Sequence, residues 1–271
     1  MQISQLIEQE AKRQGLSPKT IKTYQFCVNR FLGNKDPKKI TKQEIHQFID
    51  KLIEKKSGST VNVYLNALKF FYEQVLKKNL TINIRFTKQR KRLPEFLTQE
   101  ETTRLFSAIN NKKHQLLIKT LYASGMRVSE LVNLKVKDFQ FDKDYGWVRQ
   151  GKGGKDRMFI VAQKLKRELL GWIAENKLNY DNWLFPGRGY YHISVQSIQL
   201  ILKKAAKEAG IKKNIHPHTL RHSFATHLLE NGYAVKDVQP LLGHSSPNTT
   251  MIYLHLAAPQ LLKIKSPLDL L

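Results

Sequence analysis

The chain has 271 residues and a formal net charge of +24, because 46 lysines and arginines face 22 aspartates and glutamates. A single cysteine, Cys27, excludes a disulfide framework and a cysteine-rich zinc site. No apolar run approaches the ~18–20 residues of a membrane-spanning helix, and the N-terminus lacks the apolar core of a signal peptide. We therefore expect a soluble cytoplasmic protein of one or two domains, with nucleic acid or an acidic membrane surface as its anionic partner.

Residues 1–84 carry helix signals at short intervals. Ser17 followed by Pro18 is typical of a helix start, with an N-cap and then proline in the first turn. Residues 41–44 (TKQE) form a capping box before a second apolar stripe, and a further helix is expected after Ser57. With the N-terminal segment this makes about four helices, which predicts a small helical bundle.

A basic stretch, residues 85–94 (RFTKQRKRLP), separates this part from the remainder. Residues 1–84 carry a net charge of +8, the stretch +5 and residues 95–271 +11, so the charge is densest in the join. We interpret the stretch as a linker that contacts phosphates, with a solvated loop as the alternative. The expected DNA contacts of the linker are Arg85, Lys88, Arg90, Lys91 and Arg92.

Residues 95–271 predict a second, mostly helical domain with a small antiparallel sheet. Another capping box, residues 98–101, opens it. The segments 139–141, 147–150 and 157–161 are short and partly alternating, and the glycine-rich turn GKGG lies between the last two, as in a hairpin. Helical periodicity returns afterwards and extends to residues 249–255. The expected fold class is mainly α (α+β).

Six of the nine histidines lie in the last 56 residues, which raises the question of a metal site. His218 and His222 stand four residues apart on a predicted helix, but the glutamate of a zinc-protease helix is missing and Arg221 lies between them. Acidic residues are scarce after His218, which argues against a magnesium nuclease. No metal site is expected.

The same helix suits a phosphate instead. His218 and Arg221 share a face, and a guanidinium beside an imidazole can clamp a phosphate oxygen. A second arginine, Arg127, stands at a predicted helix start. Taken alone, each candidate has a structural alternative: Tyr253, for example, could be a core aromatic. Together, however, two arginines, a lysine and two histidines around a phenol suit phosphoryl transfer without metal.

Four segments of the chain resemble the tyrosine recombinase (phage integrase) family. They are LYASGMRVSELVNL (121–134), GKGGKDR (151–157), HPHTLRHSFATHLLENG (216–232) and LLGHSSPNTTMIYLH (241–255), in the family's order and at similar spacing. The resemblance covers the whole chain, because residues 1–84 also look like the family's helical core-binding domain. It implies a DNA strand transferase that needs no cofactor.

The resemblance also implies a role for each matching residue. Tyr253 would be the nucleophile that forms a 3′-phosphotyrosyl link, with His218 as its base. Arg127 and Arg221 would hold the non-bridging oxygens, and His244 would hydrogen-bond the phosphate in the transition state. This agrees with the chemistry of tyrosine, whose pKa near ~10 requires a base and a positive site.

The glycine-rich turn would supply the acid. Lys152 would protonate the departing 5′ oxygen, while Lys155 and Arg157 are expected to contact DNA phosphates. Bland roles are expected for the neighbours: Glu130 as a structural partner of the Arg127 helix, His216 before Pro217 as the start of the next helix, and packing or surface roles for the remaining histidines.

Among family members, the chain resembles the compact Xer-like group, which resolves chromosome or plasmid dimers. A homo-oligomer is then expected, as a dimer per DNA site and a tetramer in the synapse. The apolar tail after Tyr253 would dock on a neighbouring subunit or pack on its own domain. The alternatives are an integrase of a mobile element, a type IB topoisomerase and a non-catalytic DNA-binding protein. A lipid binder is disfavoured, because no predicted helix pairs a Lys/Arg face with a bulky aromatic face.

Overall fold

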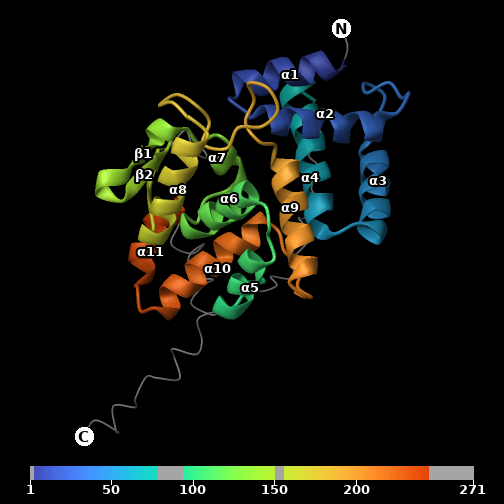
Figure 1. Ribbon diagram of the computed structural model, residues 1–271. Helices are drawn as coiled ribbons and strands as arrows, with labels where there is room; N and C mark the ends of the chain where they lie inside the picture. Colours follow the sequence, from blue (N-terminus) through green and yellow to red (C-terminus); the bar gives the residue numbers. More distant parts are fainter. Residues whose placement is uncertain (1–2, 79–93, 150–155, 244–271) are drawn as a thin grey trace, which may run out of the picture. The chain divides into compact units, whose positions relative to one another are not determined.

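The computed structural model describes residues 3–78, 94–149 and 156–243. The chain forms two compact units, Met1–Arg92 and Leu93–Leu271, which we call unit 1 and unit 2 (Figure 1). In the part of the chain that the model describes, no helix is long and apolar enough to cross a membrane.

Unit 1 is a helical bundle whose helix starts follow from local capping. The hydroxyl of Ser17 accepts from the backbone N–H of Thr20, and Thr41 and Glu44 form a reciprocal capping box. The described elements of unit 1 are α1 (Ile3–Arg13), α2 (Pro18–Leu32), α3 (Lys42–Lys55), α4 (Gly58–Lys69) and the π-helical turn η1 (Phe70–Val75).

The core of unit 1 is apolar and aromatic. Ile7, Val28, Ile49 and Leu68 are fully buried, and each such side chain contributes roughly 1.5–3 kcal/mol relative to an exposed one. The π-helical turn η1 widens the end of α4 and buries three consecutive aromatic residues, 70–72. The bundle is therefore held by ordinary hydrophobic packing.

Unit 2 is mostly helical with one small sheet. Its described elements are α5 (Gln99–Ser107), α6 (Lys112–Ala123), α7 (Val128–Val132), η2 (Val136–Asp138), β1 (Phe139–Gln140), η3 (Phe141–Lys143), β2 (Tyr145–Val148), β3 (Arg157–Ile160), α8 (Gln163–Glu175), α9 (Val195–Glu208), α10 (Pro217–Glu230) and α11 (Val235–Leu242). The sheet is antiparallel in the order β1-β2-β3, and Trp147 pairs with Met158. The predicted fold class, mainly α with a small antiparallel sheet, is confirmed. The predicted helix at 249–255 lies outside the described residues.

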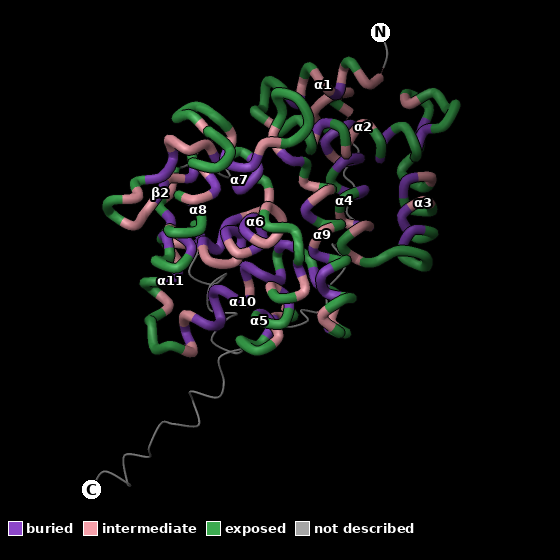
Figure 2. Tube along the Cα trace, viewed as in Figure 1, coloured by how far each residue is buried: buried purple, intermediate pink, exposed green. Residues whose placement is uncertain are grey.

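Helix α10 is the central helix of unit 2. It lies beside α6, and α5, α8 and α9 surround the pair (Figure 1). Ten of its fourteen residues are buried, which Figure 2 shows as purple along its length. A helix buried all round usually carries only apolar side chains, but α10 buries Thr219, Arg221, Ser223 and His227 as well.

Candidate active site

Arg221 projects from the second turn of α10 into the protein interior. The residue is only 3% exposed. Nη1 donates to the carbonyl of Gly125 at 2.7 Å, and Nη2 donates to the carbonyl of Leu242. The guanidinium therefore ties α10 to the turn between α6 and α7 and to the end of α11, so its position is fixed.

A close approach of two backbones makes this bridge possible. Gly125 has a φ of +57°, and a Cβ placed on it would lie 2.4 Å from a ring carbon of Phe224 on α10. Only glycine fits this position without strain, because other residues rarely adopt a positive φ and the ring leaves no room. The local sequence Ser-Gly-Met thus brings α10 against the turn that carries Arg127.

Arg127 immediately precedes α7 and shares a carboxylate with another arginine. Glu130, which is 8% exposed, accepts from the backbone N–H of Arg127 at 2.8 Å and from its Nη1 at 2.7 Å. The same carboxylate accepts from Nη2 of Arg157 at 2.6 Å. Burial raises the pKa of Glu130, but the adjacent Arg157 and the hydrogen bonds from Arg127 outweigh it, so the net pKa is lowered. Glu130 is therefore an ionised clamp between two arginines, the structural role expected for it.

Arg157 has a role that the sequence analysis did not predict. Its side chain is 9% exposed, and besides Glu130 it binds the carbonyl of Leu241 through Nη1 at 2.5 Å. Both of its terminal nitrogens thus have acceptors inside the protein. Arg157 thus connects β3, α7 and the end of α11, and the DNA contact expected of it stays a prediction.

The end of α11 is consequently held by two arginines. Arg157 donates to the carbonyl of Leu241, and Arg221 donates to the carbonyl of Leu242. Both carbonyls lie in the last turn of α11, where no backbone N–H of the helix is available to them. Gly243 caps the helix in a left-handed conformation, and a Cβ on it would lie 2.5 Å from Cδ of Arg157. The residue that follows Gly243 in the chain is His244, so the chain leaves α11 beside both arginines.

His218 stands at the start of α10, on the solvent side. His216 caps this helix, because its Nδ1 accepts from the backbone N–H of Thr219 at 3.3 Å. Partial burial and then the positive charges of His216 and Arg221 lower the pKa of His218, and Arg127 adds to the shift. Glu130 opposes it. A neutral imidazole is thereby favoured, and a neutral imidazole can accept a proton.

These interactions place four of the predicted functional residues in one cluster: Arg127, Arg157, His218 and Arg221. Four others follow or precede described elements of this cluster but lie outside the described residues, namely Lys152, Lys155, His244 and Tyr253. The expected linker contacts Arg85, Lys88, Arg90, Lys91 and Arg92 also lie outside them. Within the described ranges, no group of three or more histidine, cysteine or acidic side chains is arranged to hold a metal ion.

His227 attaches α10 to α6. It is buried on α10, and its Nδ1 lies 2.7 Å from the hydroxyl of Tyr122 on α6. Ser223, one turn earlier, accepts from the backbone N–H of Leu97 and donates to the carbonyl of Thr219, both at 2.8 Å. The polar residues of α10 therefore attach the helix to its surroundings, and no spacing in the sequence distinguishes them from surface residues.

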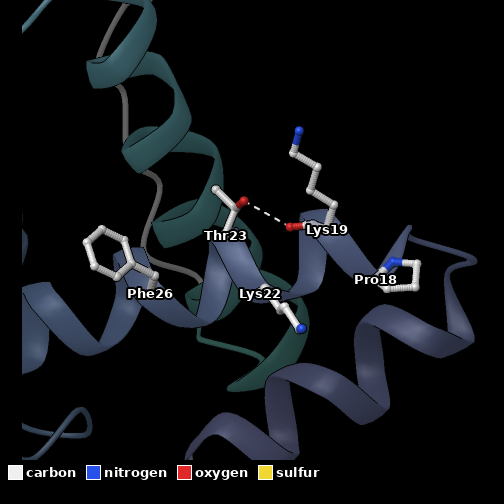
Figure 3. A pocket seen from close by; sticks show the side chains of 5 residues that line it. All are labelled: Pro18, Lys19, Lys22, Thr23 and Phe26. Carbon is white, nitrogen blue, oxygen red and sulfur yellow. Dashed lines mark hydrogen bonds between the residues drawn. The ribbon is translucent and has the colours of Figure 1, made fainter. Parts of the chain in front are cut away.

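Unit 1 offers a different kind of surface. A hollow on α2 is lined by Pro18, Lys19, Lys22, Thr23 and Phe26 (Figure 3). Phe26 is 59% exposed, and the hydroxyl of Thr23 donates to the carbonyl of Lys19 at 2.9 Å. The hollow combines lysines with an apolar ring, and none of its five lining residues is an arginine, a histidine or a carboxylate.

The fold and the cluster together define a two-unit protein with an arginine–histidine site suited to a phosphodiester. The chain belongs to the phage integrase family of tyrosine recombinases, enzymes that break and rejoin DNA strands. The family's model matches residues 95–259, and the model of the phage integrase N-terminal SAM-like domain matches residues 3–82.

Individual relatives agree with this assignment. The chain is 35% identical to a tyrosine recombinase of Pseudothermotoga lettingae, covering 89% of this chain and 88% of the relative. It is 36% identical to tyrosine recombinase XerA of Pyrococcus furiosus, covering 92% and 87%. Among solved structures, XerH site-specific recombinase bound to its palindromic difH substrate in a post-cleavage complex superposes with a TM-score of 0.76 at 26% identity, covering 97% of this chain and 83% of that one.

Proposed function

We propose that this recombinase cuts duplex DNA at a defined site and rejoins it to a partner strand through Tyr253. The phenol oxygen attacks the scissile phosphorus, its proton passes to His218, and the bond to the 5′ oxygen breaks as Lys152 protonates that oxygen. A 5′ hydroxyl of the partner DNA then attacks the 3′-phosphotyrosyl link and releases Tyr253. The energy of the phosphodiester is kept throughout, so the reaction needs neither ATP nor a metal.

The observation that carries this proposal is the fixed position of the arginines. Arg221 is held by two backbone carbonyls and Arg127 by Glu130, so both guanidiniums are oriented before substrate arrives. Donors that need no reorganisation stabilise developing charge more strongly than mobile ones. We assign Arg127 and Arg221 to the non-bridging oxygens, and His244, the residue after the cap of α11, to the transition state.

We further propose that both units bind DNA. The matching solved structures include recombinases bound to their DNA substrates. In this chain, the lysines of the α2 hollow, the basic linker residues and Lys155 are the proposed phosphate contacts. The proposed assembly is a dimer on each site and a tetramer in the synapse, with the C-terminal tail docked on a neighbour. Because its substrate is cellular DNA, we place the protein in the cytoplasm.

The proposed biological role is resolution of chromosome or plasmid dimers, which the names of the Xer relatives favour. An integrase of a mobile element is the second candidate, because two relatives that are 35% identical are named integrase/recombinase. DNA recovered from the covalent adduct distinguishes the two. Chromosomal or plasmid sites indicate resolution, and the ends of a mobile element indicate integration.

A nicked suicide substrate in EDTA tests the chemistry. We expect a covalent protein–DNA adduct with the native chain and none with Tyr253→Phe, which still binds DNA. Tyr233→Phe is the matched control, because Tyr233 is 57% exposed and lies apart from the cluster on the turn before α11. An adduct that persists in Tyr253→Phe, or an absolute need for divalent metal, contradicts the mechanism. Relaxation of supercoiled plasmids that lack the site would instead indicate topoisomerase activity.

A further inference from the structure

The connection between α8 and α9 carries an unusual pair of aromatic side chains. Tyr190 is 98% exposed and Tyr191 is 79% exposed, more than any other large hydrophobic side chain in the described residues. Both lie in residues 186–192, which we call the tyrosine turn. Two adjacent phenols in water gain nothing from folding, so their exposure points to a contact with another molecule.

Internal contacts hold the backbone of the tyrosine turn. The N–H of Gly187 donates to the carbonyl of Tyr191 at 2.7 Å, and Pro186 pairs with His192 as an antiparallel bridge. The crossing is close, because a Cβ on Gly187 would lie 2.4 Å from the carbonyl oxygen of His192. The two tyrosines therefore stand on a rigid support, which reduces the entropy lost when they bind something.

A tryptophan at the base of the turn adds to this support. Nε1 of Trp183 donates to the carbonyl of Tyr190 at 3.2 Å, and its ring meets the ring of His192 edge-on at 5.2 Å. The ammonium of Lys135 lies 4.8 Å from the centre of the Trp183 ring. The base of the turn thus combines aromatic packing with positive charge.

The charge around the turn is positive. Arg188 is exposed, and no hydrogen bond or ion pair to other described residues engages its guanidinium. The carboxylate of Asp181 is occupied by Lys137, with Nζ 2.6 Å from Oδ1. Lys113 donates to the carbonyl of Pro186 at the start of the turn. An anionic partner is therefore favoured over a second strongly basic protein surface.

The chain that leads into the tyrosine turn is attached to the segment after α7, the helix that Arg127 precedes. The chain before the turn is hydrogen-bonded to the segment after α7, with Leu184 N–H donating to the carbonyl of Leu134 at 2.8 Å and Val136 N–H to that of Asn182 at 3.1 Å. Figure 1 shows this connection beside α7. Arg127 to Lys135 spans at most about 18 Å, from one short helix and three extended residues.

We propose that the tyrosine turn is a second DNA-contacting element of unit 2, separate from the catalytic cluster. Arg188 pairs with a phosphate, and Tyr190 and Tyr191 bind the sugar–phosphate backbone of the same duplex at nucleotides other than the scissile one. Arginine and tyrosine are both common donors to DNA backbone oxygens. The proposal rests on the proposed function only for the identity of the ligand, duplex DNA.

Photocrosslinking in the full-length chain tests the contact directly. Tyr190→p-benzoylphenylalanine is irradiated with a labelled 40-base-pair duplex of mixed sequence, and Tyr233→p-benzoylphenylalanine is the control at another exposed tyrosine. We expect a protein–DNA crosslink from position 190 that exceeds the control by at least about tenfold. A crosslink from position 190 to a second copy of the chain, or none above the control, overturns the proposal.

Measuring DNA affinity at several salt concentrations separates the contribution of the two tyrosines from that of Arg188. Tyr190→Ala combined with Tyr191→Ala is expected to raise the Kd for the duplex about tenfold, the effect of about 1.4 kcal/mol, without changing the dependence of log K on log salt. Arg188→Ala is expected to reduce that slope by about 0.9, because one phosphate contact is lost. Unchanged affinity in all three replacements also overturns the proposal.

Adduct formation is scored on the same protein preparations. A chain that crosslinks at position 190 but forms no Tyr253 adduct retains the tyrosine turn and refutes the proposed chemistry. A chain that forms the adduct without the crosslink retains the chemistry and refutes the turn. The two proposals therefore fail separately.

Discussion

Units 1 and 2 bury different kinds of side chains. The buried side chains of unit 1 that the structure describes are aliphatic or aromatic, apart from Cys27. Among its described residues, unit 2 buries ten that are polar or charged, including Glu130, Arg221 and His227. Burying a polar group costs free energy unless the group finds a hydrogen-bond partner. The interior of unit 2 therefore depends on such partners, whereas that of unit 1 does not.

The difference shows what each unit is built to do. Unit 1 needs only a stable shape that presents a surface, and ordinary packing is sufficient for that. In unit 2 the buried charges are satisfied by named partners: Arg221 by two backbone carbonyls, Glu130 by two arginines. These partners fix the groups that the proposed reaction uses. Each of the following predictions tests this contrast.

The largest effect is expected at Arg221. Arg221→Lys keeps a positive charge but cannot bridge the carbonyls of Gly125 and Leu242, and it loses the planar fork that matches a phosphate. Adduct formation should fall by about 10²–10³-fold, the usual loss for one preorganised donor. Single-turnover rates with saturating DNA, alongside far-UV circular dichroism as a check of folding, measure this. A rate within tenfold of the native chain would show that the fixed guanidinium is not needed.

A core substitution in unit 1 should act on stability alone. Leu68 is fully buried, so Leu68→Ala is expected to lower the free energy of unfolding of unit 1 by about 2–5 kcal/mol. The single-turnover cleavage rate on prebound DNA should stay near the native value. Urea titration followed by circular dichroism measures the loss, and Leu121→Ala, at an equally buried position of unit 2, is the comparison. A cleavage defect in Leu68→Ala as large as that in Leu121→Ala would remove the functional distinction between the units.

Two glycines with similar backbones provide a matched pair. Gly125 in unit 2 has φ +57° and a crowded Cβ position, whereas Gly33 in unit 1 has φ +53° and nothing within 4 Å. Gly125→Ala should cost about 1–3 kcal/mol more than Gly33→Ala, because both incur backbone strain but only the first meets the Phe224 ring. The free energies of unfolding in urea test the difference. Equal costs would mean that α10 can move away from the turn.

The smallest effect concerns acid stability. Burial, followed by the neighbouring His218, lowers the pKa of His222 to about 4 from its usual value of 6.5. In the unfolded chain His222 therefore takes up a proton near pH 6.5, whereas in the folded chain it does so only near pH 4. Because the unfolded state binds more protons between these values, the free energy of unfolding decreases as the pH falls from 6.5 to 4. Since His222 is partly exposed, the loss is on the order of 1–2 kcal/mol.

His222→Gln should flatten this part of the pH profile. Free energies of unfolding at pH 7 and pH 4.5 measure the change, and His46→Gln, at an exposed position of α3, is the control in unit 1. An unaltered difference between the two pH values in His222→Gln would mean that other groups of unit 2 carry its acid sensitivity.

Local signals allowed much of the fold to be predicted. The helix starts at Ser17, Thr41 and Thr98 have the predicted caps, because capping depends on residues three positions apart. The hairpin around the glycine-rich turn was predicted from alternation, and its two strands pair in the structure. Both kinds of signal are short-range, so one sequence is enough to detect them.

Local patterns could not predict contacts between residues that are far apart in the chain. The internal contacts of Arg157 were not predicted, because an exposed and a buried arginine have the same local pattern. Its partners, Glu130 and Leu241, lie 27 and 84 residues away in the chain. The hydrogen bond between Tyr122 and His227 joins residues 105 positions apart, and hydrophobic periodicity cannot predict it either.

By itself, the sequence determined the excess of positive charge, the helical class, the caps and the motifs that identify the family. These features depend on composition or on residues within one or two turns of each other. Only the tertiary structure decided which cations are fixed inside the protein and which remain at its surface. That distinction depends on burial, because an arginine finds interior acceptors such as the carbonyls of Gly125 and Leu242 only after α6, α10 and α11 have packed together.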